Sequence, residues 1–430
     1  MAVRFVTLIL IFLGTCNWLG AQQDNSVVVR GHQLYLNGKP YYFVGANYWY
    51  GGLLGLEKDK RRGVERLKRE LDFLKANGVK NLRLMAGAEG SGSMNGVTRV
   101  GPPLQPEQGK FDASVLDGLD LILNEMSKRK LNAVIFVSNN WDWSGGFQQY
   151  LIWNKQAAKD LETRKPSWDE LRDVVSKFYA CVPCKTAYNE QANLILNRTN
   201  KFNQKKYIND PTIMAWELAN EPRPMRPSAN EDYKKWIADV VTMIKKKDKN
   251  HLVTLGHEGS IGTESMPLFE EIHADKNVDY LTIHIWAKNW GWFKDEKDYP
   301  QAVEKATSYV NEHIAVAEKL NKPLVIEEFG LPRDGQSFEV NSPTIFRDDY
   351  YSKMFEFVAE NAKSNGVVAG ANFWAFGGIS RPVKNQIFWK KGDDYMGDPP
   401  MEEQGLNTVF DSDKTTWAVI NKYRKLLNIK

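Results

Sequence analysis

Eight short apolar runs alternate with amphipathic segments along this 430-residue chain, and this alternation limits the folds that it can adopt. Apolar runs bounded by Gly, Pro or Asn are typical of strands buried in a parallel sheet, and the segments between them have helical spacing. Eight strand–helix units in succession predict an α/β fold with a single (β/α)8 barrel, the TIM barrel. The expected strands are residues 41–49, 79–84, 131–137, 213–221, 252–256, 278–284, 324–328 and 367–374.

The length of the chain predicts one barrel with long loops after its strands. A barrel of this type takes about 250 residues, so much of a 430-residue chain must lie in βα loops. Before the barrel, Gln33–Leu36 and Tyr41–Val44 flank Asn37-Gly38, which predicts an N-terminal β-hairpin. There is no sign of a second domain, and we expect residues 22–430 to form a single catalytic barrel.

An open, doubly wound sheet is the other fold that this alternation allows. It requires a glycine-rich phosphate-binding turn that leads from an early strand into a helix. The segment from Gly87 to Gly96 follows a strand, but its spacing is Gly87-x-x-Gly90-x-Gly92 and no helix begins there. The barrel is therefore the better interpretation.

The N-terminus has the composition of a secretory signal peptide. Arg4 supplies a positive charge, Phe5 to Leu13 is an apolar run too short to span a bilayer, and Leu19-Gly20-Ala21 offers a cleavage site. Cys16 raises the alternative of a lipoprotein, which the residue before it fits poorly. We expect residues 1–21 to be removed and the mature protein to be secreted, extracellular and free of membrane-spanning segments.

Composition argues against several kinds of partner and cofactor. A formal net charge of +4 without a basic stripe argues against nucleic acid. The six His are scattered and none pairs with acids at ligand spacing, so we expect no metal and no other cofactor. Cys181 and Cys184 lack the two further ligands of a zinc site, and in an exported protein we expect them to form a local disulfide.

Two apolar tracts end in a carboxylate and then break at Pro or Gly. The first is Trp216–Arg223, which contains Asn220-Glu221-Pro222, and the second is Val325–Gly330, which contains Glu327-Glu328. A buried strand has this pattern when it carries an acid to the rim of a parallel sheet. Two acids on separate strands are the minimum requirement for hydrolysing a glycosidic bond.

Polar and aromatic side chains follow all eight expected strands. In a barrel of this kind the active site lies at the C-terminal ends of the strands. A single polar strand end is ordinary, whereas eight with two carboxylates among them are difficult to explain by packing. The residues at these ends are Asn47, Trp49, Arg83, Asn139, Asn140, Trp141, Asn220, Glu221, His257, Glu258, His284, Trp286, Glu328 and Trp374.

The two acids must differ electrically to divide the chemistry. We expect Glu328 to stay ionised as the nucleophile, with Arg83 on a neighbouring strand stabilising its charge. We expect Glu221 to be the general acid and base, with a raised pKa. Asn220 could then reach a sugar hydroxyl beside the reacting carbon. Glu327 competes with Glu328 for the nucleophile role, because alternation along a strand leaves that choice nearly even.

With these residues in place, the chain resembles a family 5 glycoside hydrolase, and within that family the β-mannanases. Glu221 stands in the family's Asn-Glu-Pro tract. The family's nucleophile stands directly before an aromatic-Gly pair, and this selects Glu328. The other tracts that resemble mannanases are Trp216–Arg223, Gly101–Pro106, Asn140-Trp141 with Gly145-Gly146 and Gln149-Tyr150, and Glu258-Gly259.

The resemblance also implies roles in substrate binding. Arg223 is expected on the leaving-group side, Trp374 as the stacking floor under the sugar before the cleavage point, and Glu258 at a hydroxyl of the same region. On the sixth strand the wider family has His-x-Tyr, whereas this chain has His284-Ile285-Trp286. An indole N–H donates but cannot accept, so Trp286 either supports Glu328 or forms a sugar platform.

The resemblance implies a monomeric endo-acting enzyme that cleaves internal β-1,4-mannosidic bonds of mannan, glucomannan and galactomannan by double displacement. An exo-β-mannosidase or an endo-β-1,4-glucanase on the same barrel remains an alternative, because loop shape cannot be read from the sequence. A carbohydrate-binding protein without activity is a remote alternative.

Overall fold

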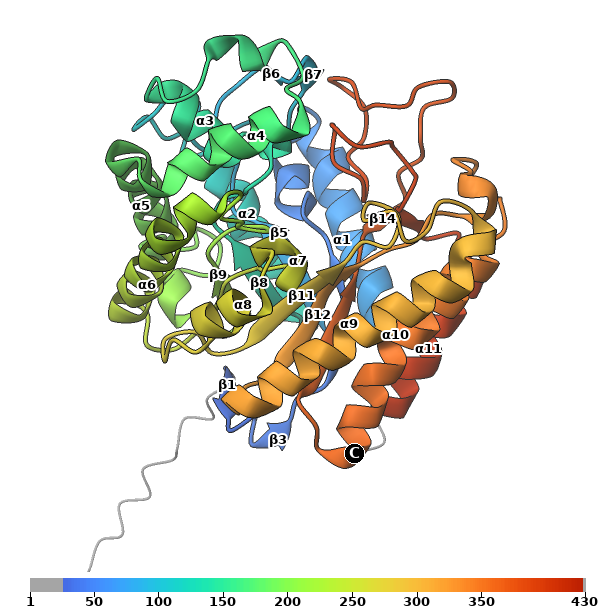
Figure 1. Cartoon of the computed structure of the whole chain (residues 1–430). Coiled ribbons are helices and arrows are strands. Elements are labelled where there is room, and N and C mark those ends of the chain that lie inside the picture. Colours follow the sequence, from blue (N-terminus) through green and yellow to red (C-terminus); the bar gives the residue numbers. More distant parts are fainter. Residues whose placement is uncertain (1–25, 428–430) are drawn as a thin grey trace, which may run out of the picture.

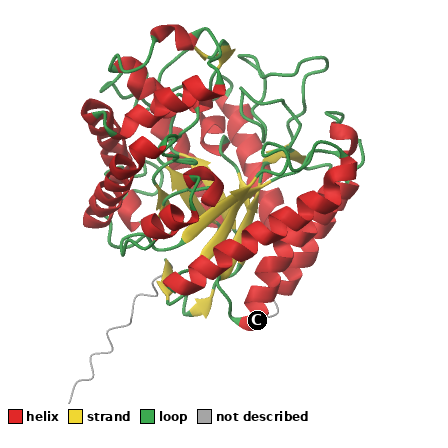
Figure 2. Ribbon diagram, viewed as in Figure 1, coloured by secondary structure: helices red, strands yellow, loops and turns green. Residues whose placement is uncertain are grey.

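The computed structural model describes residues 26–427, and the predicted signal peptide at residues 1–21 lies outside them. Eight parallel strands form one sheet in the order β10-β9-β8-β5-β4-β13-β12-β11, inside a ring of helices (Figures 1 and 2). The predicted barrel is confirmed. Its strands are β4 Phe43–Asn47, β5 Asn81–Met85, β8 Asn132–Phe136, β9 Ile213–Glu217, β10 Leu252–Thr254, β11 Leu281–Ile285, β12 Leu324–Phe329 and β13 Val368–Phe373.

The barrel closes between β10 and β11 with fewer ladder bonds than elsewhere. The backbone N–H of Asp279 donates to the carbonyl of Val253 at 2.8 Å, and that of His284 donates to the carbonyl of Glu258 at 3.1 Å. A side chain completes the seam, since the hydroxyl of Thr282 accepts from the N–H of His257 at 2.7 Å. The sheet is thus nearly closed, and its strand ends converge on one rim.

Helices connect the strands of the sheet, as the strand–helix alternation predicts. The α1 helix begins after Asp59, whose side chain accepts from the N–H of Arg62. This capping bond fixes the start of α1 at Lys60. The helices are α1 Lys60–Ala76, α2 Val115–Arg129, α3 Gly146–Trp153, α4 Trp168–Val175, α5 Val182–Leu196, α6 Asn230–Lys247, α7 Ser260–Thr263, α8 Met266–His273, α9 Tyr299–Leu320, α10 Ile345–Ser364 and α11 Lys414–Leu427.

The N-terminal hairpin differs from its prediction in one arm. The strand β2 Gln33–Leu36 pairs with β3, which spans only Lys39–Pro40, and β1 Val27–Arg30 adds a third strand. The turn is as predicted, because Asn37 and Gly38 both have positive φ. The expected second arm at residues 41–44 instead enters the barrel. The hairpin lies at the N-terminal end of the barrel, below β1 in Figure 1.

The surplus residues lie in two long loops at the opposite end. One contains α3, α4 and α5 and connects β8 to β9; within it a disulfide joins Cys181 and Cys184. The other, residues 379–408, lies between the short strands β14 Phe376–Gly378 and β15 Val409–Phe410 and is drawn in red tones above β14 in Figure 1. We name it the β14–β15 loop. None of the helices within residues 26–427 combines the length and apolarity needed to cross a bilayer.

Candidate active site

Glu221 follows β9 at a sharp turn of the chain. It has a φ of 51°, in the left-handed region that costs a non-glycine residue about 1 kcal/mol. The turn is fixed by the N–H of Glu221, which donates to the carbonyl of Gly256 at 2.8 Å, and by Pro222 after it. The carboxyl group is buried, with 6% of the residue exposed.

Glu328 lies within β12, the seventh barrel strand, at an irregularity of the sheet. In the register between β11 and β12, Ile283 pairs with Ile326 and His284 pairs with Glu328, so Glu327 is an extra residue. Such a bulge changes the direction of side chains and is common beside active sites. It explains how Glu327 and Glu328 can both be buried next to Arg83, which strict alternation would not predict.

Glu328 lines the cavity at the barrel rim, whereas Glu327 does not. The Oε2 of Glu327 is 3.6 Å from Nε2 of His284 and 3.7 Å from Nε of Arg83, beyond hydrogen-bonding distance. Neither carboxylate oxygen of Glu327 has a hydrogen-bond partner within residues 26–427. The geometry thus agrees with the choice of Glu328 that the motif made.

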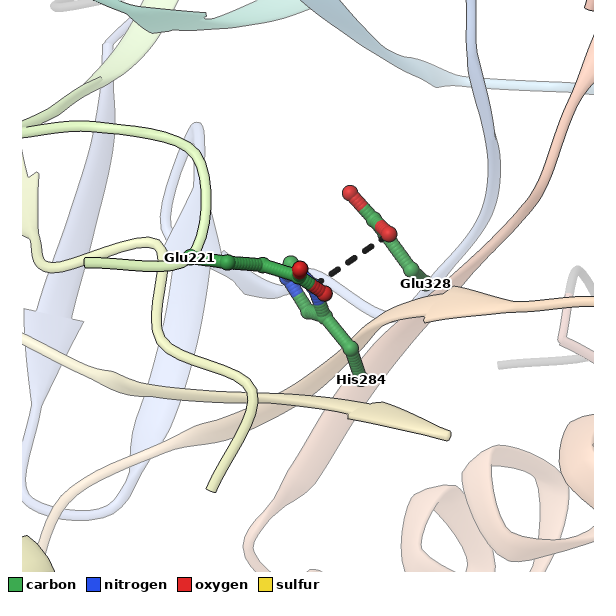
Figure 3. A group of neighbouring side chains, drawn as sticks. All are labelled: Glu221, His284 and Glu328. Carbon is green, nitrogen blue, oxygen red and sulfur yellow. Dashed lines mark hydrogen bonds and ion pairs between the residues drawn. The ribbon is translucent and has the colours of Figure 1, made fainter. Parts of the chain in front are cut away.

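His284 lies between the two carboxylates that face the cavity (Figure 3). Its Nδ1 is 2.6 Å from Oε1 of Glu221 and 3.3 Å from Oε2 of Glu328. One carboxylate oxygen of each Glu and a nitrogen of His284 all lie within 4.8 Å of one another. The two acids are therefore close enough to act on the same bond from two sides.

Arg83 connects the strands below this group. It donates to Oε1 of Glu328 through Nη1 and to Oδ1 of Asn220 through Nη2 at 2.7 Å, and it forms a two-bond ion pair with Glu217. The predicted contact between Arg83 and Glu328 is present. Glu217 was not predicted, although it stands four residues before Glu221 in the same tract. This buried pair fixes the guanidinium under the nucleophile candidate.

Trp286 contacts Glu328 directly. Its indole N–H donates to Oε2 of Glu328 at 3.0 Å, and its ring packs edge-on against Trp374 at 5.8 Å. Both rings line the cavity. The sequence left two roles open for Trp286, support of Glu328 and a sugar platform. The hydrogen bond from its N–H corresponds to support of Glu328.

Trp141 and Arg223 lie on the other side of Glu221. The indole N–H of Trp141 donates to Oε2 of Glu221, and the guanidinium of Arg223 lies over the Trp141 ring at 5.0 Å. Arg223 also makes two hydrogen bonds to Glu258, of 2.5 and 2.6 Å. Glu258 therefore lies on the Arg223 side of the site. The resemblance had placed it in the same region as Trp374.

The rim surrounds a cavity of about 510 Å³. Arg83 and His284 lie just beneath its floor and bond to residues that line it. Six further lining residues are not among the predicted site residues. Trp143, Ile261, Asn289 and Trp290 follow strand-end motifs within a few residues, whereas Trp168 and Glu402 belong to loops far from these motifs. The lining residues are Trp141, Trp143, Trp168, Asn220, Glu221, Arg223, Glu258, Ile261, Trp286, Asn289, Trp290, Glu328, Trp374 and Glu402.

The proton of this site lies on His284. Burial opposes the imidazolium charge, but the carboxylates of Glu328 and Glu221 outweigh it and raise the pKa of His284 well above 6.5. Burial likewise raises the pKa of Glu221, but the hydrogen bond and charge of His284 outweigh it and lower that pKa to about 2. The expected rise in the pKa of Glu221 is therefore wrong for the free enzyme, because sequence analysis did not foresee the ion pair.

Glu221, His284 and Glu328 also have the composition of a three-ligand metal site. No His pairs with acids at ligand spacing along the sequence, but the fold brings His284 next to two acids from other strands. A metal ligand must be a neutral imidazole, whereas Nδ1 of His284 lies 2.6 Å from Oε1 of Glu221 and forms a hydrogen bond with it. The absence of a metal remains a prediction.

Comparison with known proteins assigns the chain to a family. Residues 24–430 match the family model described as GH family 5 beta-mannosidase-like. The crystal structure of a glycoside hydrolase family 5 mannosidase from Rhizomucor miehei is 32% identical, has a TM-score of 0.83, and covers 94% of this chain and 98% of that chain. Mannan endo-1,4-beta-mannosidase 4 of Solanum lycopersicum is 28% identical over 363 residues, which are 82% of this chain and 83% of the relative. The endo-1,4-beta-mannanase of Rhizomucor miehei is 21% identical with a TM-score of 0.68 and shares the fold.

A (β/α)8 barrel with two adjacent carboxylates at the ends of its fourth and seventh strands has the fold and the acid pair of a barrel glycoside hydrolase. Within that class, this chain belongs to glycoside hydrolase family 5. It is a hydrolase of the mannanase and mannosidase type.

Proposed function

We propose that the protein hydrolyses β-1,4-mannosidic bonds with retention, with Glu328 as the nucleophile and Glu221 as the general acid and base. The single observation that carries this proposal is the separation of the two acids, whose oxygens lie within 4.8 Å. Retaining glycosidases have carboxyl groups about 5–5.5 Å apart, and inverting ones about 6.5–9.5 Å. The short distance between one oxygen of each acid supports the retaining arrangement.

In the first step Glu328 attacks the anomeric carbon, and Arg83 and Trp286 orient its two oxygens by donating to Oε1 and Oε2. As the new C–O bond forms, Glu328 loses its negative charge. That charge is the largest influence that favours the proton on His284. The proton can therefore pass from Nδ1 to Oε1 of Glu221, and Glu221 donates this same proton to the departing oxygen.

In the second step the glycosyl–enzyme ester is hydrolysed. Glu221, which has given its proton to the departing sugar, takes one from water, and the hydroxide formed attacks the anomeric carbon. The C–O bond to Glu328 breaks, and the carboxylate regains its charge beside Arg83 and His284. The proton on Glu221 can then return to Nδ1 of His284, which restores the starting state.

The substrate class that we propose is β-mannan, cleaved at internal bonds in mannan, glucomannan and galactomannan. The curated relatives are named mannan endo-1,4-beta-mannosidases, and they support internal cleavage. We also propose that the mature chain is a secreted monomer. The test is release of reducing sugar from locust bean gum, linear mannan and carboxymethyl cellulose by residues 22–430. Release from cellulose alone would move the substrate to a β-glucan.

A second candidate is removal of single mannose units from chain ends, and the β14–β15 loop favours it. Its Tyr395 hydroxyl donates to the carbonyl of Gly101 at 2.7 Å, and the indole of Trp49 donates to the carbonyl of Gly397 at 2.7 Å. These bonds join the loop to the loops after the first two barrel strands. Glu402 of the same loop lines the cavity together with Glu328 and Trp374.

In this second candidate, the part of the loop around Glu402 forms a wall that closes one end of the site, so that a chain enters from the other end. The α1 helix supports the wall from behind: Arg66 donates to the carbonyl of Tyr395 at 2.7 Å, and Arg62 binds Asp394 at 2.5 Å. Burial, followed by the negative charges of neighbouring acids, raises the pKa of Glu402 well above 4.5. A protonated Glu402 can donate to a sugar hydroxyl and form the end of the site.

Product profiles distinguish the two candidates. Early digestion of mannohexaose by an internal-cleaving enzyme gives mannobiose, mannotriose and mannotetraose. A chain-end enzyme gives mannose and mannopentaose, and it lowers the viscosity of a locust bean gum solution only slightly. The Rhizomucor miehei relative is named a mannosidase, which agrees with the second outcome.

A further inference from the structure

Trp168 is an aromatic residue at the cavity that the mechanism does not use. Half of it is exposed, which is unusual for so large an apolar side chain, and it lines the same cavity as the two acids. Its ring stacks on Trp141 at 6.2 Å with an interplanar angle of 28°, and Arg223 lies 5.9 Å from its centre. An indole face that remains open beside a sugar site is available for stacking.

The direction of this face follows from its neighbours. Trp141 donates to Oε2 of Glu221, the oxygen of the acid that does not face His284. The general acid protonates the leaving oxygen, so Trp141 marks the leaving-group side. Glu221 contacts Trp141, and Trp141 in turn contacts Trp168. Trp168 therefore lies further from the cleavage point than Trp141 does.

The position of Trp168 is fixed relative to the acid. It is the first residue of α4, and the hydroxyl of Ser167 caps this helix by accepting from the N–H of Glu170 at 3.1 Å. Arg172 of α4 donates to the carbonyl of Met225 at 2.8 Å, and Arg226 binds Asp173 at 2.7 Å. These bonds join the helix to the segment that directly follows Glu221 and Arg223.

We propose that Trp168 is a distal sugar platform on the leaving-group side, which binds a mannosyl unit beyond the one next to the cleaved bond. It extends the Trp141 and Arg223 surface and selects substrates with a longer leaving chain. This inference rests on the proposed hydrolysis of β-mannosides. It holds for internal and chain-end cleavage alike, since both leave a chain on this side.

The test is Trp168→Ala with Trp168→Tyr and Phe202→Ala as comparisons. Phe202 is another exposed aromatic residue, 47% exposed, which does not line the cavity. We expect Trp168→Ala to lower kcat/KM for mannohexaose about tenfold, the upper range of one aromatic contact. Its kcat/KM for the 4-nitrophenyl mannoside or mannobioside that the parent cleaves should change less than twofold, because the aryl group does not reach Trp168. Trp168→Tyr should retain most activity on mannohexaose, and Phe202→Ala all of it.

Two results would overturn the platform. One is an equal loss on aryl glycoside and mannohexaose, which would mean that Trp168 only supports Trp141. The other is no loss on either substrate. Both differ from failure of the proposed function, in which the parent protein itself does not hydrolyse any β-mannoside. Equal melting temperatures of the four proteins, together with normal aryl glycoside activity, exclude misfolding.

Discussion

The two ends of the barrel are built from the same strands but have opposite interiors. At the N-terminal end the interior is apolar and is covered by the β1–β3 hairpin. At the C-terminal end, buried acids face Arg83 and His284. The apolar set is Val27, Leu34, Tyr41, Phe43, Val134, Met214, Ala215, Leu252, Tyr280, Val325 and Ala369. The charged set is Arg83, Glu217, Glu221, His284, Glu327 and Glu328.

The difference separates stability from activity along each strand. On β12, Val325 packs in the apolar end, and three residues later Glu328 faces the substrate cavity. The charged end contains groups that a folded protein normally avoids, such as the carboxylate of Glu327 without a hydrogen-bond partner among residues 26–427. Burial of apolar side chains at the other end offsets this cost in stability. Substitutions at the apolar end should therefore change mainly the stability, and substitutions at the charged end mainly the activity.

The largest effect is expected from Glu328→Ala. The variant lacks the nucleophile, and its kcat on mannan should fall by about 10⁴-fold or more. It should remain folded, because Arg83 keeps Glu217 and Asn220 as partners. Reducing-sugar release and melting temperature are the measurements. A variant with parental activity would contradict the assignment.

Glu221→Ala should lower kcat on mannan by about 10²–10⁴-fold, the usual contribution of a general acid and base. A 2,4-dinitrophenyl glycoside needs no proton on its leaving group, so formation of the glycosyl–enzyme should be much less affected. Azide should restore turnover and give a β-mannosyl azide. If azide has no effect, or gives the α-azide, Glu221 does not have this role.

The ion pair of Glu221 and His284 predicts a bell-shaped effect of pH on stability. The pKa of Glu221 is lowered from 4.5 to about 2, so its stabilisation is present above pH 4.5 and is lost as the pH falls toward 2. The pKa of His284 is raised above 6.5, so its stabilisation is complete below pH 6.5 and is lost as the pH rises through the folded pKa. The difference in unfolding free energy between parent and His284→Gln should be largest between these limits, on the order of 2–3 kcal/mol. A difference independent of pH from 3 to 9 would argue against the pair.

Val325→Ala tests the opposite end. The side chain is buried and loses two methyl groups, which should lower the unfolding free energy by about 2 kcal/mol. The kcat on mannan should change less than twofold at 25 °C, because the acids are untouched. Denaturant unfolding and initial rates measure the two quantities. If kcat fell with stability, the two ends would not be separable.

The smallest effect is expected from metal removal. Dialysis against EDTA should leave activity and melting temperature unchanged, because Nδ1 of His284 is already bound to Oε1 of Glu221 by a hydrogen bond of 2.6 Å. Loss of activity with EDTA and recovery with one divalent ion would make the group a metal site. Glu328→Gln, which lacks the nucleophile, is measured in parallel and gives the background rate of the assay.

The comparison also explains which features the sequence predicts. Strand periodicity and the motifs at strand ends found the barrel, both carboxylates, and Arg83 beneath them, because parallel strands bring their ends together regardless of loop shape. The bulge at Glu327 was not predictable, since a register shift depends on the partner strand and not on local pattern. The same holds for the low pKa of Glu221, which depends on a His from two strands away.

Loop residues account for the remaining differences. Glu402 and Trp168 lie in segments whose path is set by contacts with α1 and with the turn after Glu221, respectively. The path of each segment depends on these contacts with distant parts of the chain, which the local sequence does not reveal. The mode of cleavage and the length of the binding site depend on these segments, which is why the sequence left both open.

The most direct test of the double-displacement account is to trap its intermediate. The purified protein is treated with 2-deoxy-2-fluoro-β-mannosyl fluoride, and the labelled peptide is sequenced by mass spectrometry. We predict one 2-fluoromannosyl group per chain, esterified to Glu328. A label on Glu327, or complete substrate turnover by a protein that never becomes labelled, would contradict the account.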